Sequence, residues 1–533
     1  MKMSNMVNFA TATYIDAEIA EYEGHPLINA LPRINSPQKT AELIRRTPKV
    51  CPEEVILPAY IRRHAMLRIM DSFLYPTKAH LQLEQTISSM IRQGYLSRNI
   101  ADKSYQETLN GTADVHKNNS RNAGNEALVS SVIGCSGAGK STAVEAVLAG
   151  YDQVIMHTSY QHVQLVWLKV ECPHDASVKS LCINFFRALD TALDNDNEYE
   201  KQYVKPRANA EMLLGDFARI AALHSIGLLV IDEIQHLERS KSGVSERILR
   251  FFVQLTNTIK LPILFVGTPK AYALFSPSMR SARRASQFGS INWNRFNTVD
   301  KTGKGSDWDR FFTRLWSLQW FKSQQPLTNE IKNLFWDYSQ GIAHVAVTLF
   351  YLCQTRAVTV GKEIINKELV DEIFEDELHM IGPMIRALQS GSEKDIEYYG
   401  DLEIPKAALI QTDATFNENN NTPSSKPVDD KEVSKLHQLT VMLEQMGLGE
   451  DIAPIVAEQA IFELPRGNLF DLIAHIKNLE DKLAPKPETK KPKTVKLSPA
   501  YVENDLRLMI NRKGGTYKII KNEGVIINIS EYL

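Results

Sequence analysis

A glycine-rich run of eight residues, set between a strand-like and a helix-like stretch, constrains the fold of this chain more than any other feature. The run reads Gly134-Cys135-Ser136-Gly137-Ala138-Gly139-Lys140-Ser141, and Thr142 follows it directly. Residues 129–133 before it predict a strand, and residues 142–148 after it predict a helix that Gly150 ends. The pattern GxxxxGK[ST] in this setting is typical of a loop that binds nucleotide phosphates.

The residue types of this run suit a polyphosphate ligand. Glycines let backbone N–H groups close around phosphate oxygens, and the N-terminus of the following helix adds positive potential. Lys140 is expected to neutralise the β- and γ-phosphates, and the Ser141 hydroxyl is expected to bind Mg²⁺. The sequence therefore predicts ATP and Mg²⁺ as ligands, with residues 134–142 as the nucleotide-binding segment.

A second apolar run, residues 228–231, ends in the acidic pair Asp232 and Glu233. Four apolar residues in a row predict a buried central strand, and Asp232 at its end can hold the water shell of Mg²⁺. Glu233 is placed to orient and deprotonate an attacking water molecule. The alternative is a buried strand that simply ends in a solvated acidic turn.

Two further features lie downstream. Residues 262–266 predict a third buried strand, and Thr268 just beyond it is a candidate contact for the γ-phosphate or the water, although a plain turn hydroxyl fits equally. Arg280 and Arg284 are candidates for an arginine finger that a neighbouring copy supplies in trans. A solvated basic face or a DNA contact would explain the same arginines.

Strand and helix patterns alternate between about residues 127 and 267, which predicts an α/β core with a parallel sheet covered on both faces. The expected strands are 129–133, 154–157, 165–170, 228–231 and 262–266, and the expected helices are 178–193, 210–223 and 245–258. Consecutive helical patterns follow at 325–390. Residues 411–430 are too polar to form a core, and residues 484–496 hold three prolines and five lysines.

These patterns divide the chain into seven expected segments. They are a mixed N-terminal partner-binding region at 1–120, an α/β ATPase core at 121–322, a helical lid at 323–400, a disordered linker at 401–432, a small helical region at 433–483, a Pro/Lys spacer at 484–500 and a docking segment at 501–533.

Charge and cysteine content narrow the class of protein. The 533 residues carry 61 Lys+Arg against 63 Asp+Glu, so any nucleic-acid surface must be local. Lys201, Lys205 and Arg207 beside Tyr199 and Tyr203 form one such stretch, which suits a phosphate backbone or a solvated loop. Five scattered cysteines, no apolar run of about 18 residues and no secretory signal predict a cytoplasmic protein.

Beyond these general motifs, the chain resembles TnsC, the AAA+ regulator of bacterial transposons that use a TnsA endonuclease and a TnsB transposase. The matching core segments are 184–190 (NFFRALD), 227–237 (GLLVIDEIQHL), 266–270 (VGTPK) and 280–284 (RSARR), with shorter likenesses at 29–32 (NALP), 89–92 (SMIR) and 505–507 (DLR). One departure is that 341–344 (GIAH) offers no arginine where AAA+ lids often carry a sensor arginine.

The resemblance implies an AAA+ P-loop NTPase core with a helical lid, flanked by a mixed N-terminal region and a linker-connected helical C-terminal region. It also implies an ATP-dependent regulator of DNA transposition that forms a ring of six or seven copies on duplex DNA without sequence preference. The implied partners are a TnsA-like endonuclease, a TnsB-like transposase and a target-selecting protein of the TnsD or TniQ kind. Two rivals stay open: a replication-initiator or clamp-loader-like ATPase, and a signalling ATPase that does not bind DNA.

Overall fold

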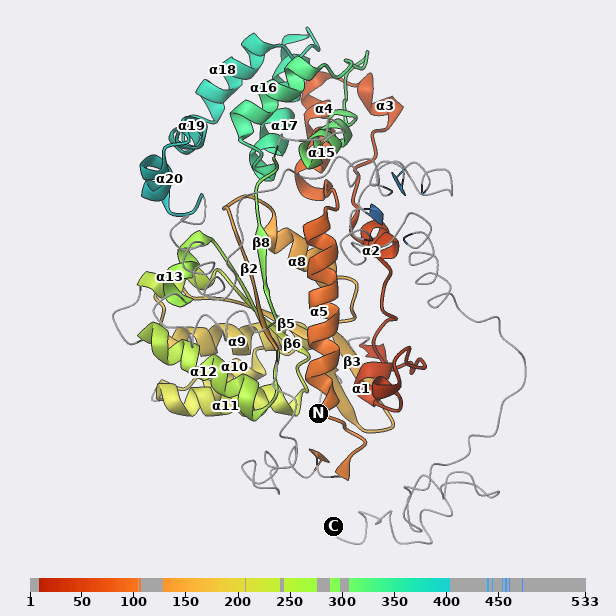
Figure 1. Ribbon diagram of the computed structural model, residues 1–533, viewed down its shortest axis with the longest axis vertical. Coiled ribbons are helices and arrows are strands. Elements are labelled where there is room, and N and C mark those ends of the chain that lie inside the picture. The colour runs from red at the N-terminus through yellow and green to blue at the C-terminus, as the bar shows by residue number, and fades with distance from the viewer. Residues whose placement is uncertain are drawn as a thin grey trace, which may run out of the picture. The chain divides into compact units, whose positions relative to one another are not determined.

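The computed structural model describes residues 9–103, 105–106, 128–206, 208–239, 244–275, 288–297 and 306–402, together with single positions between 439 and 472 (Figure 1). The chain divides into two units, Met1–Leu483 and Ala484–Leu533. Every described residue belongs to the first unit, so the predicted spacer and docking segment lie outside the described residues, as does all of the predicted linker except Asp401 and Leu402.

A five-stranded parallel sheet forms the centre of the first unit. Its strands, in spatial order, are β5 (Trp167–Glu171), β6 (Leu228–Asp232), β7 (Ile263–Gly267), β2 (Val129–Gly134) and β8 (Ser290–Trp293). The pairing aligns Ile133 with Gly267 and Ile231 with Phe265, so the ends of β2, β7 and β6 lie side by side at one edge. The predicted α/β class with a parallel sheet is therefore confirmed.

Side chains of the central strand β6 alternate between two hydrophobic clusters. Leu229 and Ile231 join the cluster on one face, whereas Leu228 and Val230 join the cluster on the other. Because both faces are covered, the whole run is apolar rather than alternating. The buried strand that the sequence predicted at 228–231 forms as expected.

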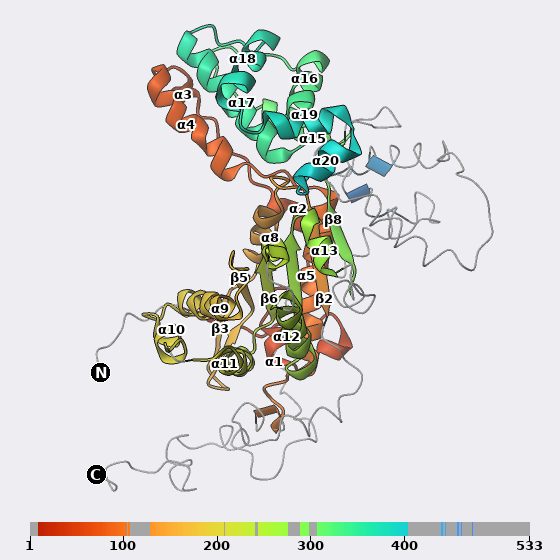
Figure 2. The same ribbon diagram turned by 90° about the vertical axis from the view of Figure 1, so that its left-hand side faces the viewer.

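Helices cover both faces of the sheet (Figure 2). The first cluster holds α9 (Val178–Leu193), α11 (Ala210–Leu223) and α12 (Val244–Thr258), the three helices that the sequence predicted, with α10 (Glu198–Tyr203) beside them. Phe185 of α9 and Phe217 of α11 stack there with ring centroids 3.6 Å apart. The second cluster holds α5 (Lys78–Leu96) and α8 (Lys140–Leu148).

A second, three-stranded sheet corrects one expectation. The strand predicted at 154–157 forms as β3 (Val154–His157), but it pairs with β1 (Ala10–Thr11) and antiparallel with β4 (His162–Leu165), outside the central sheet. Only residues 158–161 separate β3 from β4, which is enough for a hairpin but too few for the crossover that parallel pairing needs. The fifth strand of the central sheet is β8, which the sequence analysis did not predict.

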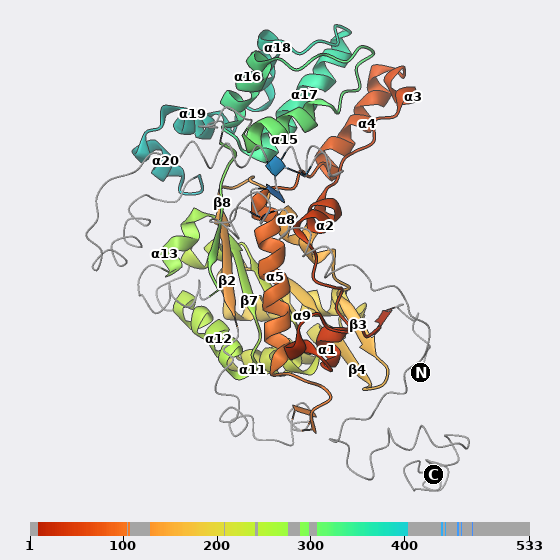
Figure 3. The ribbon, with the colours of Figure 1, turned by 45° about the vertical axis from the view of Figure 1, so that its right-hand side comes forward.

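Consecutive helices follow the sheet, and we call them the lid; the lid was predicted to begin at residue 323, whereas the first of these helices begins at Asp307. They are α15 (Asp307–Trp316), α16 (Asn329–Ser339), α17 (Ala343–Val360), α18 (Lys367–Glu377), α19 (Gly382–Ser390) and α20 (Glu393–Tyr399). Helices α19 and α20 pack in a cluster with Cys135 of the glycine-rich loop, whereas the first four contribute to a cluster rich in aromatic residues. An N-terminal helix, α4 (Ala59–Ser72), lies beside α17 and places Met66 and Ile69 in this cluster (Figure 3). The lid thus shares its core with a segment almost 300 residues earlier, since Thr355 and Met66 are in contact with a sequence separation of 289.

Short elements complete the described part of the chain. They are η1 (Ala20–Tyr22), α1 (Pro26–Asn29), α2 (Pro37–Ile44), α3 (Pro52–Val55), η2 (Ile234–Arg239), η3 (Pro269–Ala271) and α13 (Tyr272–Phe275). The described positions between 439 and 472 bury side chains such as Leu439 and Val456 against Ala41 and Leu81. Among the described residues, no helix combines the length and the apolar character that crossing a membrane would need.

A buried ion pair ties α4 to the lid. Arg62 is 4% exposed and donates hydrogen bonds to the Trp320 carbonyl oxygen at 2.9 Å and to Glu363 Oε1 at 2.7 Å. Burial alone would raise the pKa of Glu363, but the hydrogen bonds from Arg62 and from the Lys322 N–H lower it below its usual value. The pair therefore stabilises the fold above the ordinary carboxyl range and loses this contribution as the pH falls through the lowered pKa.

We expect Arg62→Met to destabilise the lid by about 3 kcal/mol, because it leaves Glu363 without the cation that offsets its burial. Urea unfolding followed by tryptophan fluorescence measures this, since the buried Trp308 and Trp320 lie in the lid cluster. Arg63→Met, at an exposed position of the same helix, is the matched control and should change stability by less than about 0.5 kcal/mol. Equal effects of the two variants would contradict a role for the buried pair.

Candidate functional site

The glycine-rich loop joins β2 to α8 in the predicted strand–loop–helix arrangement. Gly137 and Gly139 have φ angles of +75° and +90°, a left-handed conformation that other residues rarely adopt. A Cβ atom at Gly134 would lie 1.9 Å from the Trp293 carbonyl oxygen of β8. Glycine is therefore required at these positions for the loop to turn from the sheet edge into the helix.

Lys140, the first residue of α8, is only 8% exposed. Its Nζ donates hydrogen bonds to the carbonyl oxygens of Gly134 and Cys135, each at 2.8 Å, so the ammonium group lies inside the curve of the loop. Burial lowers the pKa of Lys140, and nearby acidic groups, among them Asp232 and Glu233, oppose this shift. A buried cation held by backbone carbonyls is a natural counter-charge for an anionic ligand.

Asp232 ends β6 and is 4% exposed. Its Oδ2 forms an ion pair at 3.1 Å with Lys169 Nζ of the neighbouring strand β5, and Lys169 also contacts Glu145 of α8 at 2.6 Å. Burial would lower the pKa of Lys169, but its hydrogen bonds with Glu145 and Asp232 raise it above its usual value. Lys169 thus connects the carboxylate of Asp232 to the helix that follows the loop.

Glu233 takes a left-handed φ of +57° directly after β6, and its N–H donates to Asp232 Oδ1 at 2.9 Å. Its carboxylate accepts a hydrogen bond from the Gln235 side-chain amide. The other end of that amide, Gln235 Oε1, accepts from the Thr268 N–H at 3.0 Å. Gln235 therefore links the acidic strand end of β6 to the polar strand end of β7.

Thr268 lies just beyond β7 and is 6% exposed. Its hydroxyl donates to Asp401 Oδ1 at 2.7 Å, and Lys270 Nζ pairs with Asp401 Oδ2 at 2.8 Å. The three predicted strand ends are therefore neighbours at one edge of the sheet, and the end of the lid reaches them. Asp232, Glu233 and Thr268 lie beside the loop for two reasons. Strands β6, β7 and β2 are neighbours in the sheet, and Gln235 hydrogen-bonds to the Thr268 backbone.

A cavity of about 170 Å³ opens beside the loop. It is lined by the N-terminal segment between Met70 and His80, by the loop from Gly137 to Thr142, by residues 293–296 after β8 and by the start of α17. His80 and Trp293 meet in its wall with ring centroids 4.8 Å apart, and burial lowers the pKa of His80 to about 3, so the ring is neutral near pH 7. Aromatic rings dominate this wall, with Arg295 also in the lining, and an aromatic wall beside a phosphate-type loop suits a nucleoside base.

The residues at the sheet edge fit ATP and Mg²⁺. A buried ammonium, exposed loop positions at Ser136 and Gly137, and a buried carboxylate at Asp232 supply the donors for phosphate and the oxygen for a hard cation. Ser141, half-buried in the first turn of α8, adds the hydroxyl oxygen that the sequence predicted as a metal ligand. Thr142 beside it is exposed and lines the cavity.

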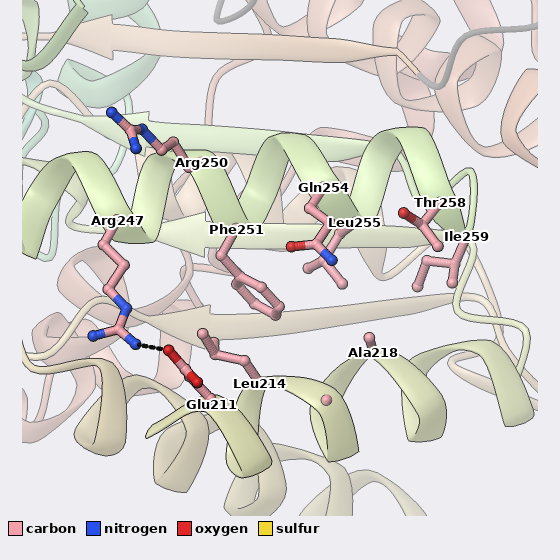
Figure 4. A pocket seen from close by; sticks show the side chains of 11 residues that line it. Glu211, Leu214, Ala218, Arg247, Arg250, Phe251, Gln254, Leu255, Thr258 and Ile259 are labelled. Atoms are coloured by element: carbon pink, nitrogen blue, oxygen red, sulfur yellow. Dashed lines mark hydrogen bonds and ion pairs between the residues drawn. The ribbon is translucent and has the colours of Figure 1, made fainter. Parts of the chain in front are cut away.

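A larger hollow of about 420 Å³ lies between α11 and α12 (Figure 4). Apolar side chains such as Leu214 and Phe251 form its floor, and Arg247 bridges to Glu211 at 2.8 Å across its mouth. It contains none of the predicted catalytic or nucleotide-binding residues. The smaller cavity at the sheet edge is therefore the candidate site.

The predicted DNA-contacting residues lie far along the chain from the loop and are only partly described. Lys201 on α10 and Lys205 after it are exposed, and Lys201 Nζ donates to the Asp196 carbonyl oxygen at 2.5 Å. Arg207 lies outside the described residues, as do Arg280 and Arg284. The finger and DNA roles of these five residues stay predictions.

The sequence analysis missed several residues of the site. Lys169 could have been recognised weakly from the sequence, because a lysine inside a strand needs an anionic or polar partner when it is buried. Gln235 and Lys270 fall inside segments that resemble the transposition regulators but were given no role. Asp401, His80 and Trp293 gave no signal at all, because only folding brings them to the loop.

Comparison with known proteins identifies the core. Residues 124–275 match the family model described as an AAA domain. The chain contains an AAA-type P-loop ATPase domain. Its parallel sheet with surrounding helices is the AAA+ P-loop NTPase fold, and this domain implies nucleotide binding. No curated protein matches the sequence.

The chain is distantly similar to several solved structures. A Walker-type ATPase of Pyrococcus abyssi is 11% identical, with 64% of this chain and 93% of that chain covered and a TM-score of 0.31. The ORC1 protein of Aeropyrum pernix in complex with DNA is 16% identical, covering 72% and 86%, with a TM-score of 0.33. The Holliday junction branch migration motor RuvB of Thermotoga maritima is 16% identical, covering 62% and 93%, with a TM-score of 0.29.

We expect Lys140→Ala to abolish nucleotide binding, because the loop loses the ammonium group at its centre. Fluorescence titration with a labelled ADP measures the weakening, which should exceed about 100-fold in Kd. Lys201→Ala is the matched control, since this exposed lysine lies on α10 and should leave the Kd unchanged. Nucleotide binding by Lys140→Ala at the wild-type Kd would exclude the loop as the phosphate site.

Proposed function

We propose that this chain hydrolyses ATP and uses the nucleotide as a switch. In this proposal the loop amides and Lys140 bind the β- and γ-phosphates, and Ser141 and Asp232 would hold Mg²⁺, whose charge offsets that of the phosphates. Glu233 takes the proton of the attacking water, and Thr268 orients the water or the γ-phosphate. The convergence of Lys140, Asp232, Glu233 and Thr268 at one sheet edge is the observation that carries this proposal.

We further propose that the switch regulates DNA transposition. The support is the sequence resemblance to TnsC at 184–190, 227–237, 266–270 and 280–284. On this proposal, ATP-bound copies assemble as a ring on duplex DNA, connect a TnsD- or TniQ-like target-selecting protein to a TnsB-like transposase, and disassemble on hydrolysis. Arg280 or Arg284 acts in trans on the nucleotide of a neighbouring copy, and residues 501–533 contact a TnsA-like endonuclease.

Glu233→Gln tests the switch and the assembly together. The amide keeps the shape of the side chain but cannot accept the proton, so ATP should stay bound while hydrolysis slows by about 100-fold or more. With ATP and duplex DNA, electron microscopy should then show long-lived rings on the DNA. Glu238→Gln, at an exposed position of η2, is the matched control and should hydrolyse ATP at the wild-type rate.

Each rival function has its own outcome in this experiment. Hydrolysis by Glu233→Gln at the wild-type rate would contradict the assignment of the base. Stable ATP binding with no assembly on DNA and no stimulation of ATPase by DNA would favour the signalling ATPase. Rings on DNA that fail to capture or stimulate a TnsB-like transposase would favour the replication-initiator or clamp-loader class.

Neutralising Lys201, Lys205 and Arg207 should weaken DNA binding equally for all sequences, because interactions with the phosphate backbone carry no sequence information. The slope of log K against log salt should flatten by about 0.9 for each phosphate that the variant no longer neutralises. The matched control neutralises Lys362, Lys367 and Arg386, which are exposed on the lid and carry the same charge. An unchanged slope, or an equal change in the control, would assign the DNA surface to other residues.

A further inference from the structure

The residues that directly follow the last lid helix reach into the nucleotide site. Asp401 follows α20 and makes two side-chain contacts there: its Oδ1 accepts from the Thr268 hydroxyl at 2.7 Å, and its Oδ2 pairs with Lys270 Nζ at 2.8 Å. Its backbone carbonyl oxygen also accepts from the Ser136 N–H of the glycine-rich loop at 3.2 Å. The residue after the lid thus binds a hydroxyl and an ammonium group with its side chain and a loop amide with its backbone.

The residues on either side hold Asp401 in this place. Gly400 has a left-handed φ of +64°, which favours glycine, and it lies directly against the Lys270 side chain. Leu402 is 5% exposed and belongs to a cluster with Cys135 of the loop and with lid residues of α17, α18 and α19. The position of Asp401 is therefore built into the packing of the lid against the loop.

These donors are of the kind that a terminal phosphate requires. A phosphate, like a carboxylate, is an anionic acceptor, and it would draw on a loop N–H, a threonine hydroxyl and a lysine at the ends of the central strands. The electrostatic field of Asp401 also reaches Lys140, the cation that faces the phosphates. The Asp401 carboxylate and a γ-phosphate cannot both occupy the Thr268 hydroxyl and Lys270, because two anions at such short distance repel each other. The Ser136 N–H is taken by the backbone carbonyl of Asp401 rather than by its carboxylate.

We propose that Asp401 is a specificity-determining residue whose carboxylate competes with the γ-phosphate for Thr268 and Lys270. This inference rests on the proposed function, since it assumes that the loop binds ATP. A diphosphate lacks the competing group and leaves Asp401 in place. A triphosphate displaces Asp401, and because Leu402 follows it directly, the end of the lid moves with it.

Because of this competition, binding of the third phosphate changes the position of the lid. Part of the binding free energy of ATP is used to break the interactions of Asp401, so the chain binds ATP less tightly than the loop alone would. In return, the lid adopts a different position with ATP than with ADP. The device needs no sensor arginine in the lid, which residues 341–344 do not provide.

The test is the Kd of Asp401→Asn for a labelled non-hydrolysable ATP analogue and for labelled ADP, both with Mg²⁺. The amide retains an acceptor for Thr268 but removes the charge, so the Kd for the ATP analogue should fall by about tenfold, while the Kd for ADP should stay within about twofold. Asp401→Ala should shift the two values in the same way. Asp395→Asn, which removes an exposed carboxylate of the preceding helix α20, is the matched control and should change neither Kd.

The second measurement is the protection of the lid from hydrogen exchange. Hydrogen exchange of the segment 385–402 in the wild type should be faster with the ATP analogue than with ADP, and this difference should shrink in Asp401→Asn. Equally tighter binding of both nucleotides, unchanged binding of both, or the same effect in Asp395→Asn would overturn the role of Asp401 while leaving ATP binding by the loop intact. Wild-type protein that binds neither nucleotide, or Lys140→Ala protein that binds both as the wild type does, would overturn the proposed function and this inference together.

Discussion

Parallel pairing in the central sheet is the constraint on which the rest of the site depends. Because β6, β7 and β2 are adjacent and run in the same direction, their carboxyl ends lie at one edge of the sheet. The loop, the acidic pair and Thr268 directly follow these strands, so they lie at the same edge. Helices pack on both faces of the sheet and bury its strands. The chemistry of the site is then set by the few residues that follow each strand.

Charge at this edge is arranged as a connected set rather than as isolated pairs. Lys169 bridges Asp232 to Glu145 of the loop helix, and Gln235 connects Glu233 to the Thr268 backbone. Buried polar groups of this kind are costly when one partner is missing, so the network specifies one arrangement of the strand ends. A change at any member is transmitted to the others through direct contacts.

The sequence predicted those parts of the site that are formed by residues contiguous in the chain. The loop, the buried run before Asp232 and the run before Thr268 are contiguous patterns, and each forms the predicted strand end. Apolar runs did not predict β8, because exposed and buried residues alternate along this strand. They also failed to predict the partner of β3, since strand pairing depends on connection length rather than on composition. Asp401 could not be predicted, because 133 residues separate it from Thr268.

The shared core of α4 and the lid has a consequence for synthesis of the protein. Met66 and Ile69 emerge from the ribosome early, but their packing partners on α17 follow almost 300 residues later, as the separation of 289 between Met66 and Thr355 shows. Translation at about 5–20 residues per second leaves these apolar side chains exposed for tens of seconds. The lid is therefore a late, non-local assembly that must close around the first helices of the chain. Nascent copies that are truncated before α17 would display the apolar face of α4 to chaperones and proteases.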